Sequence, residues 1–440
     1  HFLLGFYHFI LLETYGPVPI IDHFYPSNTA KEDFPGRSHF DYCVERVCQW
    51  FDQAVEEGLP DYMEDTADIG RATSAAAKAL KARALLYAAS PFWNGDAPLA
   101  FKEWKNKNYE TPGYGKELIS STYDPKKWEK AKEACIEAID WATVQGNRAL
   151  YTLDDAETRR KAEGVSLPDI PGASSQVKEY ASLMRYLGCT TETDGNKETI
   201  FGSAFNTNEK FLDWDKTALP HAVTIYNGAP TGGRSGISPF LYTVEHFYTV
   251  NGLLPKNDPT FPSESDWFAS AGLTRPEIIN LNAMREPRFY AWIAFDGAEY
   301  GSKLANGKPL IINMRSKDKQ GYNPSKDKDL NITGYLTTKF ILPNMTWNAS
   351  SNNINSRTVP FPVIRLGELY LDLAECYAAL GDTDNALENL NVIRNRAGVP
   401  DLEPSDINTP MTLTDWVRNE RFIELWGEGH RYFDLRRWCL

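Results

Sequence analysis

A helix–turn–helix unit near the C-terminal end restricts the possible folds of this chain more than any other feature. Val363–Leu380 is expected to form a helix, Gly381-Asp382 a turn, and Thr383–Ala397 a return helix that Gly398 ends. The unit spans about 34 residues, the period of tetratricopeptide helix pairs. We therefore expect an antiparallel helix pair packed on the alanine-rich run Ser74–Ser90, whose small side chains allow close approach.

More helices are expected on both sides of a long middle region. In the first 150 residues the pattern predicts helices over Phe2–Tyr15, Ser38–Glu57 and Ser74–Ser90, and a fourth that begins at Asp124-Pro125. A last helix is expected over about Thr414–Trp426. The two ends of the chain therefore read as helix-on-helix scaffold.

Spacing also indicates which side chains these helices carry on one face. In the first helix they are Leu3, Phe6, Tyr7, Ile10 and Thr14. In the second they are Tyr42, Val47, Trp50, Phe51 and Ala54, with Gly58 as the C-terminal cap. In the fourth they are Trp128, Ala131, Cys135, Ala138 and Ala142.

The middle of the chain, residues 150–360, is rich in Gly, Pro, Asn, Asp and aromatic residues. We expect long loops with short strands such as Thr199–Phe205 and Phe289–Phe295. Loops this long are usually functional, although tolerated insertions are the alternative. The predicted fold is thus mainly α in one domain over 1–440. Residues 1–150 and 360–440 form a tetratricopeptide-like superhelical scaffold, and 150–360 form a loop-rich portion that carries a ligand site.

Charge and motifs exclude several classes of function. With 46 basic and 59 acidic residues, the net charge of −13 disfavours nucleic acid as a partner. The 6 cysteines form no C-x-x-C pair and the 7 histidines are spread singly, so we expect no metal site and no cofactor. There is no P-loop, no H-E-x-x-H and no G-x-S-x-G; Gly233-Arg234-Ser235-Gly236 has the wrong spacing. No apolar run approaches the roughly 20 residues of a membrane span.

The segment Glu420–Trp438, the C-terminal charged segment, is dense in charges and aromatic rings. An enzyme would use Glu424, Glu428 and His430 as acid and base groups. The interpretation that we favour is structural, because acidic and basic residues alternate and neutralise one another. We expect an ion-paired corner with aromatic side chains behind it.

Seven segments, in order along the chain, share their pattern with one family. They are Phe6–Ile20, Gly70–Pro91, Glu245–Gly252, Arg285–Tyr290, Thr333–Phe340, Pro362–Glu375 and Glu420–Trp438. Together they resemble the SusD/RagB family of outer-membrane lipoproteins that capture nutrients. The family's lipidated cysteine and first helical stretch are absent from this sequence. We therefore expect a chain truncated at both ends, with the lipid anchor lost from the front.

The resemblance implies a binding protein and not an enzyme. It implies a lipid-anchored protein exposed at the surface of the outer membrane, which presents oligosaccharides or polysaccharide fragments to a SusC-like TonB-dependent transporter. Two alternatives remain open: capture of oligopeptides, as in the RagB branch, and a hydrolase that acts on glycans. Sugars need coplanar aromatic rings, whereas extended peptides need free backbone groups in a cleft. The aromatic loops favour sugar.

Candidate binding residues come from the loops of the middle region. Trp214 and Tyr226 are the best candidates for stacking on a sugar ring, and Asn206, Asp215 and Arg234 could bond its hydroxyl groups. Further candidates from other loops are Trp93, Trp267 and Trp347. The alternative role for each Trp is to pack its loop onto the scaffold. No catalytic residue and no metal ligand is assigned.

Overall fold

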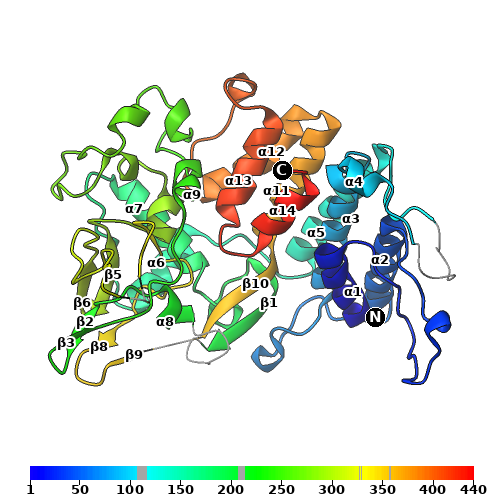
Figure 1. Ribbon diagram of the computed structural model, residues 1–440, viewed down its shortest axis with the longest axis horizontal. Coiled ribbons are helices and arrows are strands. Elements are labelled where there is room, and N and C mark those ends of the chain that lie inside the picture. The colour runs from blue at the N-terminus through cyan, green and yellow to red at the C-terminus, as the bar shows by residue number, and fades with distance from the viewer. Residues whose placement is uncertain (107–115, 207–213, 327, 329, 356–357) are drawn as a thin grey trace.

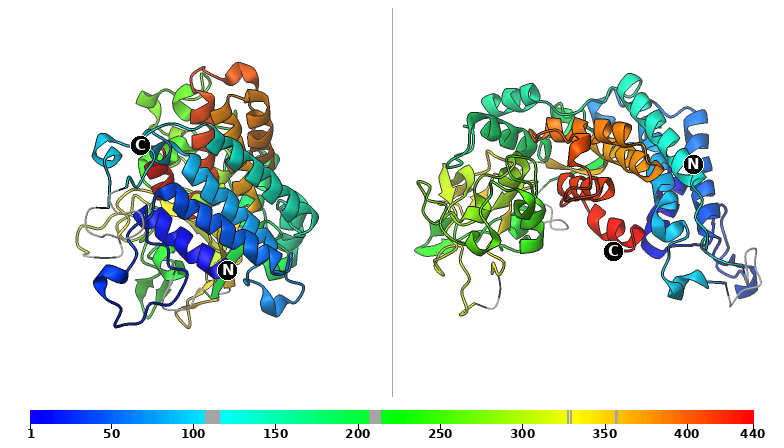
Figure 2. Two further views of the ribbon diagram at one scale, coloured as in Figure 1. Left: turned by 90° about the vertical axis from the view of Figure 1, so that its right-hand side faces the viewer. Right: turned by 90° about the horizontal axis from the view of Figure 1, so that it is seen from above.

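The computed structural model describes residues 1–106, 116–206, 214–326, 328, 330–355 and 358–440. The first helices lie at one end of the molecule and the loops and strands of the middle region at the other (Figure 1). The C-terminal helices lie between them, and the view from above shows that the whole chain curves into an arch (Figure 2).

Four long helices build the N-terminal end of the arch. They are α1 (Phe2–Tyr15), α2 (Phe40–Glu56), α3 (Ser74–Ala89) and α5 (Lys126–Val144), and each packs against the next. The Thr73 hydroxyl caps α3 by accepting from the backbone of Ala76. The alanines of α3 are buried between α2 and α5, and these predicted helices are confirmed.

Two of the predicted helix faces need correction. Helix α1 buries Phe2, Gly5, His8, Phe9 and Leu12, whereas Leu3, Tyr7 and Ile10 are exposed. Nearly every position of α1 is apolar, so spacing alone could not select the face that meets the scaffold. In α2, Tyr42 is exposed. The other expected residues of α2 and all those of α5 are buried, namely Val47, Trp50, Phe51, Ala54, Trp128, Ala131, Cys135, Ala138 and Ala142.

The helix pair near the C-terminus is present, with a later start than predicted. It consists of α11 (Leu366–Leu380) and α12 (Thr383–Arg396), joined through Gly381 in a left-handed conformation. Val363–Arg365 was predicted as helix but ends strand β10 (Thr358–Arg365), which pairs antiparallel with β1 (Thr199–Asn206). Long-range pairing and two prolines override the helical pattern there.

Helix α11 packs against α5, α12 and α13 (Leu413–Glu424), and contacts α3 as well. One of its faces, with Leu366 and Leu369, belongs to the core of the N-terminal helices. The opposite face, with Leu371 and Ala374, belongs to a second core under the middle region. The predicted contact of the pair with α3 exists, but most of that packing is made on α5.

The middle region contains more helix than predicted. Besides the loops it holds α6 (Leu153–Ala162) and α7 (Ser175–Leu187), and the short helices α8 (Trp214–Ala218), α9 (Leu241–His246) and α10 (Pro287–Trp292). The predicted strand Phe289–Phe295 is wrong, because Pro287 starts α10 and only β4 (Ile293–Ala294) follows. Caps signal the missed helices: Thr152 with Asp155 begins α6 and Ser174 begins α7.

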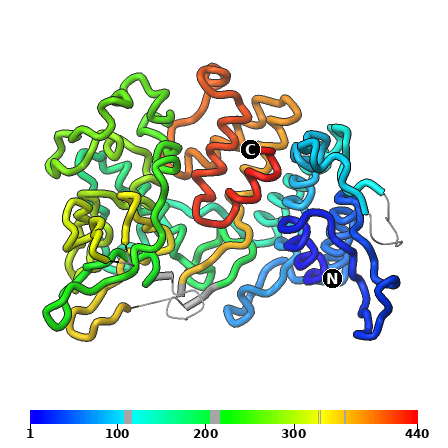
Figure 3. The backbone as a smooth tube through the Cα atoms, viewed as in Figure 1, coloured from blue at the N-terminus to red at the C-terminus, as the bar shows by residue number. Residues whose placement is uncertain are grey.

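Short strands complete the region, and the tube in Figure 3 follows their connections. The predicted strand Thr199–Phe205 is confirmed as β1. Strands β2 (Thr224–Tyr226) and β3 (Ala229–Thr231) form a hairpin, and β4 pairs with β7 (Leu336–Thr337). A small sheet has the order β6–β5–β8–β9, which are Lys308–Ile311, Glu299–Ala305, Trp347–Asn348 and Asn353–Ile354.

Candidate ligand-binding site

The turn that follows α3 holds aromatic rings in fixed positions. Pro91–Trp93 form one turn of 3-10 helix, and the Trp93 ring stacks on Phe40 with centroids 3.8 Å apart and planes 3° from parallel. The Asn94 amide donates to the carbonyl oxygens of Ala89 (3.2 Å) and Asp124 (3.0 Å). The turn is thereby tied to α2, α3 and the start of α5.

Three further rings lie beside this turn, of which Phe92 and Trp104 are half-buried against the core and Phe101 is exposed. Phe92 lies edge-on to Phe101 with centroids 5.2 Å apart, and Phe101 lies 5.9 Å from Trp104. Phe101 is 40% exposed. Gly16, which follows α1 at φ +73°, lies against the rings of Trp93 and Trp104. A Cβ atom at this position would lie 3.0 Å from Trp93 and 3.3 Å from Trp104.

Helix α14 (His430–Arg437), which the sequence analysis did not predict as a helix, brings another ring to the same side. Tyr432 is 64% exposed, and the guanidinium of Arg436, one turn later, lies 5.3 Å from the centre of its ring. Arg436 Nη1 also donates to the carbonyl of Thr14 at the end of α1 (3.1 Å). Since Gly16 packs on Trp104, α14 is joined through the end of α1 to the turn after α3.

Helix α9 adds rings on the other side of α14 (Figure 1). Phe240 and Tyr242 are 72% and 53% exposed. The Tyr242 hydroxyl accepts from Arg431 Nη2 of α14 (3.1 Å), and the Arg431 guanidinium lies 4.2 Å from the Phe422 ring centre. We call the six rings Phe92, Phe101, Trp104, Phe240, Tyr242 and Tyr432 the aromatic surface.

Buried ion pairs hold α14 in place from behind. Arg421 of α13 bonds Asp434 (2.8 Å) and is also paired with Asp372 of α11. Arg437 bonds Asp434 (2.8 Å) and both carboxylate oxygens of Glu375 (2.6 and 2.7 Å). Burial alone would raise the pKa of Asp434, but the two guanidinium groups outweigh it and lower that pKa to about 2. The outer face of α14 is therefore presented by a rigid support.

The same network contains the residues that an enzyme would use. Glu424 accepts from Arg365 (2.9 Å) and Arg288 (3.0 Å), and it is also paired with Arg396. Its side chain is completely buried, and although burial opposes ionisation, the guanidinium groups hold its pKa below the ordinary value. Glu424 is therefore a fully paired carboxylate.

Glu428 is paired in the same way. It accepts from Lys339 (2.7 Å) and Arg365 (2.9 Å), and these cations overcome burial and lower its pKa to about 2. Burial lowers the pKa of His430 to about 4. The structural interpretation of the C-terminal charged segment is confirmed for these buried groups. Many of the partners come from outside the segment, whereas internal pairing was expected.

Four of the eight predicted binding residues, Trp214, Asp215, Tyr226 and Arg234, come from segments that meet. The backbone N–H of Arg234 donates to the carbonyl of Lys216 in α8, the helix that begins with Trp214 and Asp215. Tyr226 lies half-buried in the hairpin β2–β3, which contacts the loop after Trp347 where Thr231 donates to Asn352 (2.8 Å). Asn206 ends β1. The side chains of Asn206, Trp214 and Asp215 lie outside the described part of the structure.

The three further Trp candidates need correction. Trp93, Trp267 and Trp347 are all buried, with exposed fractions of 7%, 6% and 5%. Trp93 stacks on Phe40, and the indole N–H groups of Trp267 and Trp347 donate to Pro262 and Asn352, each over 3.0 Å. These rings pack their loops, which is the alternative role stated for them, and offer no open face to a ligand.

The sequence analysis assigned no binding role to the rings of the aromatic surface. A signal for Tyr432 was available, because Tyr432 and Arg436 are four residues apart and so share a helix face. The short run Phe240–Tyr242 after Pro239 was a second signal, since three consecutive large side chains cannot all be buried on one face of a helix. Their grouping with Phe101 and Trp104 depends on contacts between distant segments.

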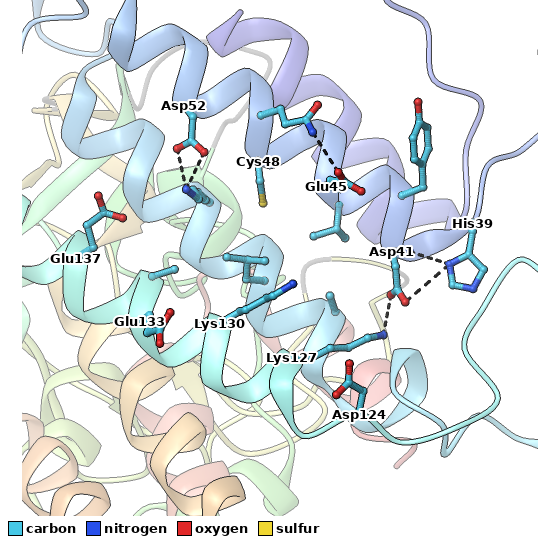
Figure 4. Close-up of a pocket in the computed structure, with 17 residues that line it drawn as sticks. His39, Asp41, Glu45, Cys48, Asp52, Asp124, Lys127, Lys130, Glu133 and Glu137 are labelled. Atoms are coloured by element: carbon cyan, nitrogen blue, oxygen red, sulfur yellow. Dashed lines mark hydrogen bonds and ion pairs between the residues drawn. The ribbon is translucent and has the colours of Figure 1, made fainter.

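A groove of about 640 Å³ lies between α2 and α5 above α3 (Figure 4). The small side chains of α3 leave this space open. Two ion pairs cross its lining, Asp41 with Lys127 (2.7 Å) and Asp52 with Lys81 (2.7 Å). Tyr42 is its only lining residue with a phenol or phenyl ring, so the groove lacks the coplanar rings that a sugar needs.

Among the described residues, no three His, Cys, Asp or Glu side chains are grouped so that they could hold a metal ion. None of the helices in the described ranges is both long and apolar enough to cross a membrane.

Comparison with known proteins identifies relatives of this chain. SusD-like protein P25 of Formosa agariphila is 33% identical over 204 residues, which cover 41% of this chain and 35% of that protein. The chain thus spans about a third of the length of this curated relative.

Among solved structures, BT4246 is 46% identical, with a TM-score of 0.92 over 100% of this chain and 72% of that chain. A SusD-like protein (BF3747) of Bacteroides fragilis shares the fold at 22% identity, with a TM-score of 0.67 over 100% of this chain and 68% of that chain. The sequence model of the SusD family matches residues 187–440, which is more than half of the chain. This chain therefore belongs to the SusD family.

Proposed function

We propose that this protein captures oligosaccharides by stacking them on the aromatic surface. Membership of the SusD family supports a nutrient-binding role. The observation that carries the proposal is the aromatic surface itself, in which four rings are exposed and two, Phe92 and Trp104, are half-buried. Contacts of Arg431, Arg436 and Gly16 link its parts.

The rings suit sugar binding for a physical reason. The C–H faces of a pyranose pack on an aromatic ring, while neighbouring polar groups bond its hydroxyls. The buried ion pairs behind α14 fix the position of Tyr432 before a ligand arrives. A preorganised surface loses less conformational entropy on binding, and so more of the stacking energy becomes affinity.

The proposed role is binding without catalysis. Glu424, Glu428 and His430 are buried, and the two carboxylates are fully engaged by cations. A glycosidase instead needs two carboxyl groups that reach the bond to be cleaved. Incubation of the protein with bound oligosaccharides and chromatography of the products tests this: released shorter fragments would overturn it.

The proposal places the full-length protein on the outer membrane, held by a lipid anchor and working with a SusC-like TonB-dependent transporter. This arrangement is typical of the family, and a dual-acyl anchor would give stable attachment. Surface labelling of cells and co-purification with the transporter test it. A full-length protein found only in the cytoplasm would contradict the proposal.

The aromatic surface is tested by substitution. A glycan-array screen first selects an oligosaccharide ligand, which is then used in calorimetric titration. Tyr432→Ala and Phe101→Ala should each weaken its binding by roughly 1–3 kcal/mol, the range known for stacking of nucleic-acid bases on aromatic side chains. Phe268→Ala is the matched control, because Phe268 is also exposed but lies on another loop. If both variants bind as tightly as the parent, the stacking site is not the aromatic surface.

Trp214 and Tyr226 remain the second candidate platform, with Asn206, Asp215 and Arg234 as bonding partners. Trp214→Ala and Tyr226→Ala belong in the same titration series. Loss of affinity in these variants alone would move the site to the region of α8 and the hairpin β2–β3. Selective binding of peptides in the initial screen would instead favour oligopeptide capture.

A further inference from the structure

Three arginines of the aromatic surface have no acidic partner among the residues that the structure describes. The guanidinium groups of Arg37, Arg431 and Arg436 lie over the rings of Trp104 (5.2 Å), Phe422 (4.2 Å) and Tyr432 (5.3 Å). Within the described ranges, no carboxylate lies within ion-pair distance of any of the three. Their positive charge is thus left available on this side of the molecule.

This is unusual for so acidic a protein. The net charge is −13, and two well-exposed arginines elsewhere, Arg71 and Arg315, are paired with carboxylates. Arg71 is bonded to Asp68 at 3.0 Å and Arg315 to Asp296 at 2.7 Å. Carboxylates are in excess in this protein. A group of arginines without a carboxylate partner among the described residues therefore indicates a surface suited to bind anions.

The three arginines belong to one continuous surface. Arg431 and Arg436 flank Tyr432 on α14, about 7.5 Å apart along the helix axis. Arg436 is bonded to Thr14, and Gly16, two residues later, packs on the Trp104 ring that Arg37 covers. A chain of direct contacts therefore runs from Tyr242 through α14 to Trp104.

The guanidinium groups keep donors for a ligand. A guanidinium has five N–H donors. Among the described residues, Arg431 gives one to the Tyr242 hydroxyl and Arg436 gives one to the Thr14 carbonyl, both neutral acceptors. The remaining N–H groups can bond two oxygens of one carboxylate or sulfate at once, which an ammonium group cannot do in the same fixed geometry.

Other ionisable groups on these elements do not cancel this charge by pairing. Asp434 is buried and engaged by Arg421 and Arg437. Glu103 and Glu245 lie beside the aromatic surface on α4 (Leu99–Lys102) and α9, but neither is bonded to the three arginines. Burial lowers the pKa of His246, so this residue adds no charge near neutral pH.

We propose that the aromatic surface selects anionic saccharides, in which a carboxylate or sulfate group binds the arginines while the sugar faces stack on the rings. This inference rests on the proposed function and specifies its ligand class. A sugar acid supplies both an apolar face and a bidentate anion, and the rings and guanidinium groups alternate along the surface to receive both.

The test compares saccharides that differ only in charge. Calorimetric titration would use oligogalacturonides against their methyl esters, and sulfated galactan oligosaccharides against the desulfated forms. We expect at least one anionic form to bind about tenfold more tightly than its neutral partner. That advantage should fall as the salt concentration is raised from about 0.05 to about 0.5 M, because salt screens the attraction between the anion and the arginines. If the oligogalacturonides show the advantage, the preferred anion is a carboxylate; if the sulfated galactans show it, the preferred anion is a sulfate.

Variants then assign the effect to the arginines. Arg431→Gln and Arg436→Gln should each remove most of the tenfold advantage, because each should weaken binding of the anionic form far more than binding of the neutral form. Arg71→Gln, an exposed arginine elsewhere, is the matched control and should keep the advantage. Thermal unfolding of each variant verifies that it is folded, and Arg436→Lys should restore only part of the selectivity if bidentate contact matters.

The outcomes separate this inference from the proposed function. Equal affinity for the charged and neutral forms, or an advantage that survives both Gln substitutions, overturns the inference and leaves glycan capture standing. Absence of binding to every saccharide of a broad array overturns both.

Discussion

Substitution of Glu428 by Gln tests the electrostatic support of α14 most directly. The carboxylate is almost completely buried and accepts from Lys339 (2.7 Å) and from Arg365 (2.9 and 3.0 Å). These cations overcome the effect of burial and lower its pKa from 4.5 to about 2. A shift of that size corresponds to about 3 kcal/mol of free energy of unfolding. Removing one member of a buried pair costs a similar amount, about 3–5 kcal/mol, because the partner is left uncompensated.

The pH dependence gives this prediction a definite sign. A depressed carboxyl pKa contributes stability above the unfolded value of about 4.5, and that contribution is lost as the pH falls toward about 2. Glu428→Gln should therefore be about 3 kcal/mol less stable than the parent at pH 7. The gap should narrow steadily below pH 4.5, since protonated Glu428 and Gln carry the same charge.

Urea unfolding followed by tryptophan fluorescence at several pH values measures this gap. Glu157→Gln is the matched control, because Glu157 pairs with Lys161 at 2.6 Å on the exposed face of α6, where solvent screens the pair and its loss should change stability little. A loss below 1 kcal/mol for Glu428→Gln at pH 7, or a gap that does not change with pH, would refute the reasoning.

Three further substitutions test the scaffold. Gly16→Val should lower the melting temperature and alter tryptophan fluorescence, because a side chain at φ +73° is strained and would meet Trp93 at 3.0 Å; an unchanged spectrum and stability would contradict this. Ala82→Trp should cost about 1–3 kcal/mol in urea unfolding by overpacking the fully buried face of α3, and Glu129→Trp at an exposed position of α5 should cost less. Burial raises the pKa of Glu13 to about 7, so its ionisation destabilises the fold as the pH rises from about 4.5 through 7. Glu13→Gln should accordingly stabilise the protein at pH 8 with little effect at pH 4.5, and equal effects at both pH values would show that the carboxyl is not held in this way.

The local pattern determined most of the helices. The bounds of α1 were predicted to the residue, and those of α3 and the return helix α12 to within one residue, because apolar spacing, caps and glycine or proline breakers act over a few residues. The pattern failed where distant segments compete. Val363–Arg365 continues the helical pattern of α11 but pairs with β1 instead, and this partner lies more than 150 residues earlier in the chain.

The sequence by itself determined the helical scaffold, the kinship of the chain with one family and the structural role of the C-terminal charged segment. Only the tertiary structure decided which rings face solvent. Trp93 and Tyr432 are both aromatic residues beside charged or polar neighbours, yet Trp93 is covered by Phe40 and Tyr432 stands open on α14. Whether a side chain is exposed depends on which residues pack against it. Phe40 lies more than 50 residues from Trp93 in the chain. Local spacing carries no information about such a neighbour, so the choice between core and binding surface is made by the assembly of distant helices.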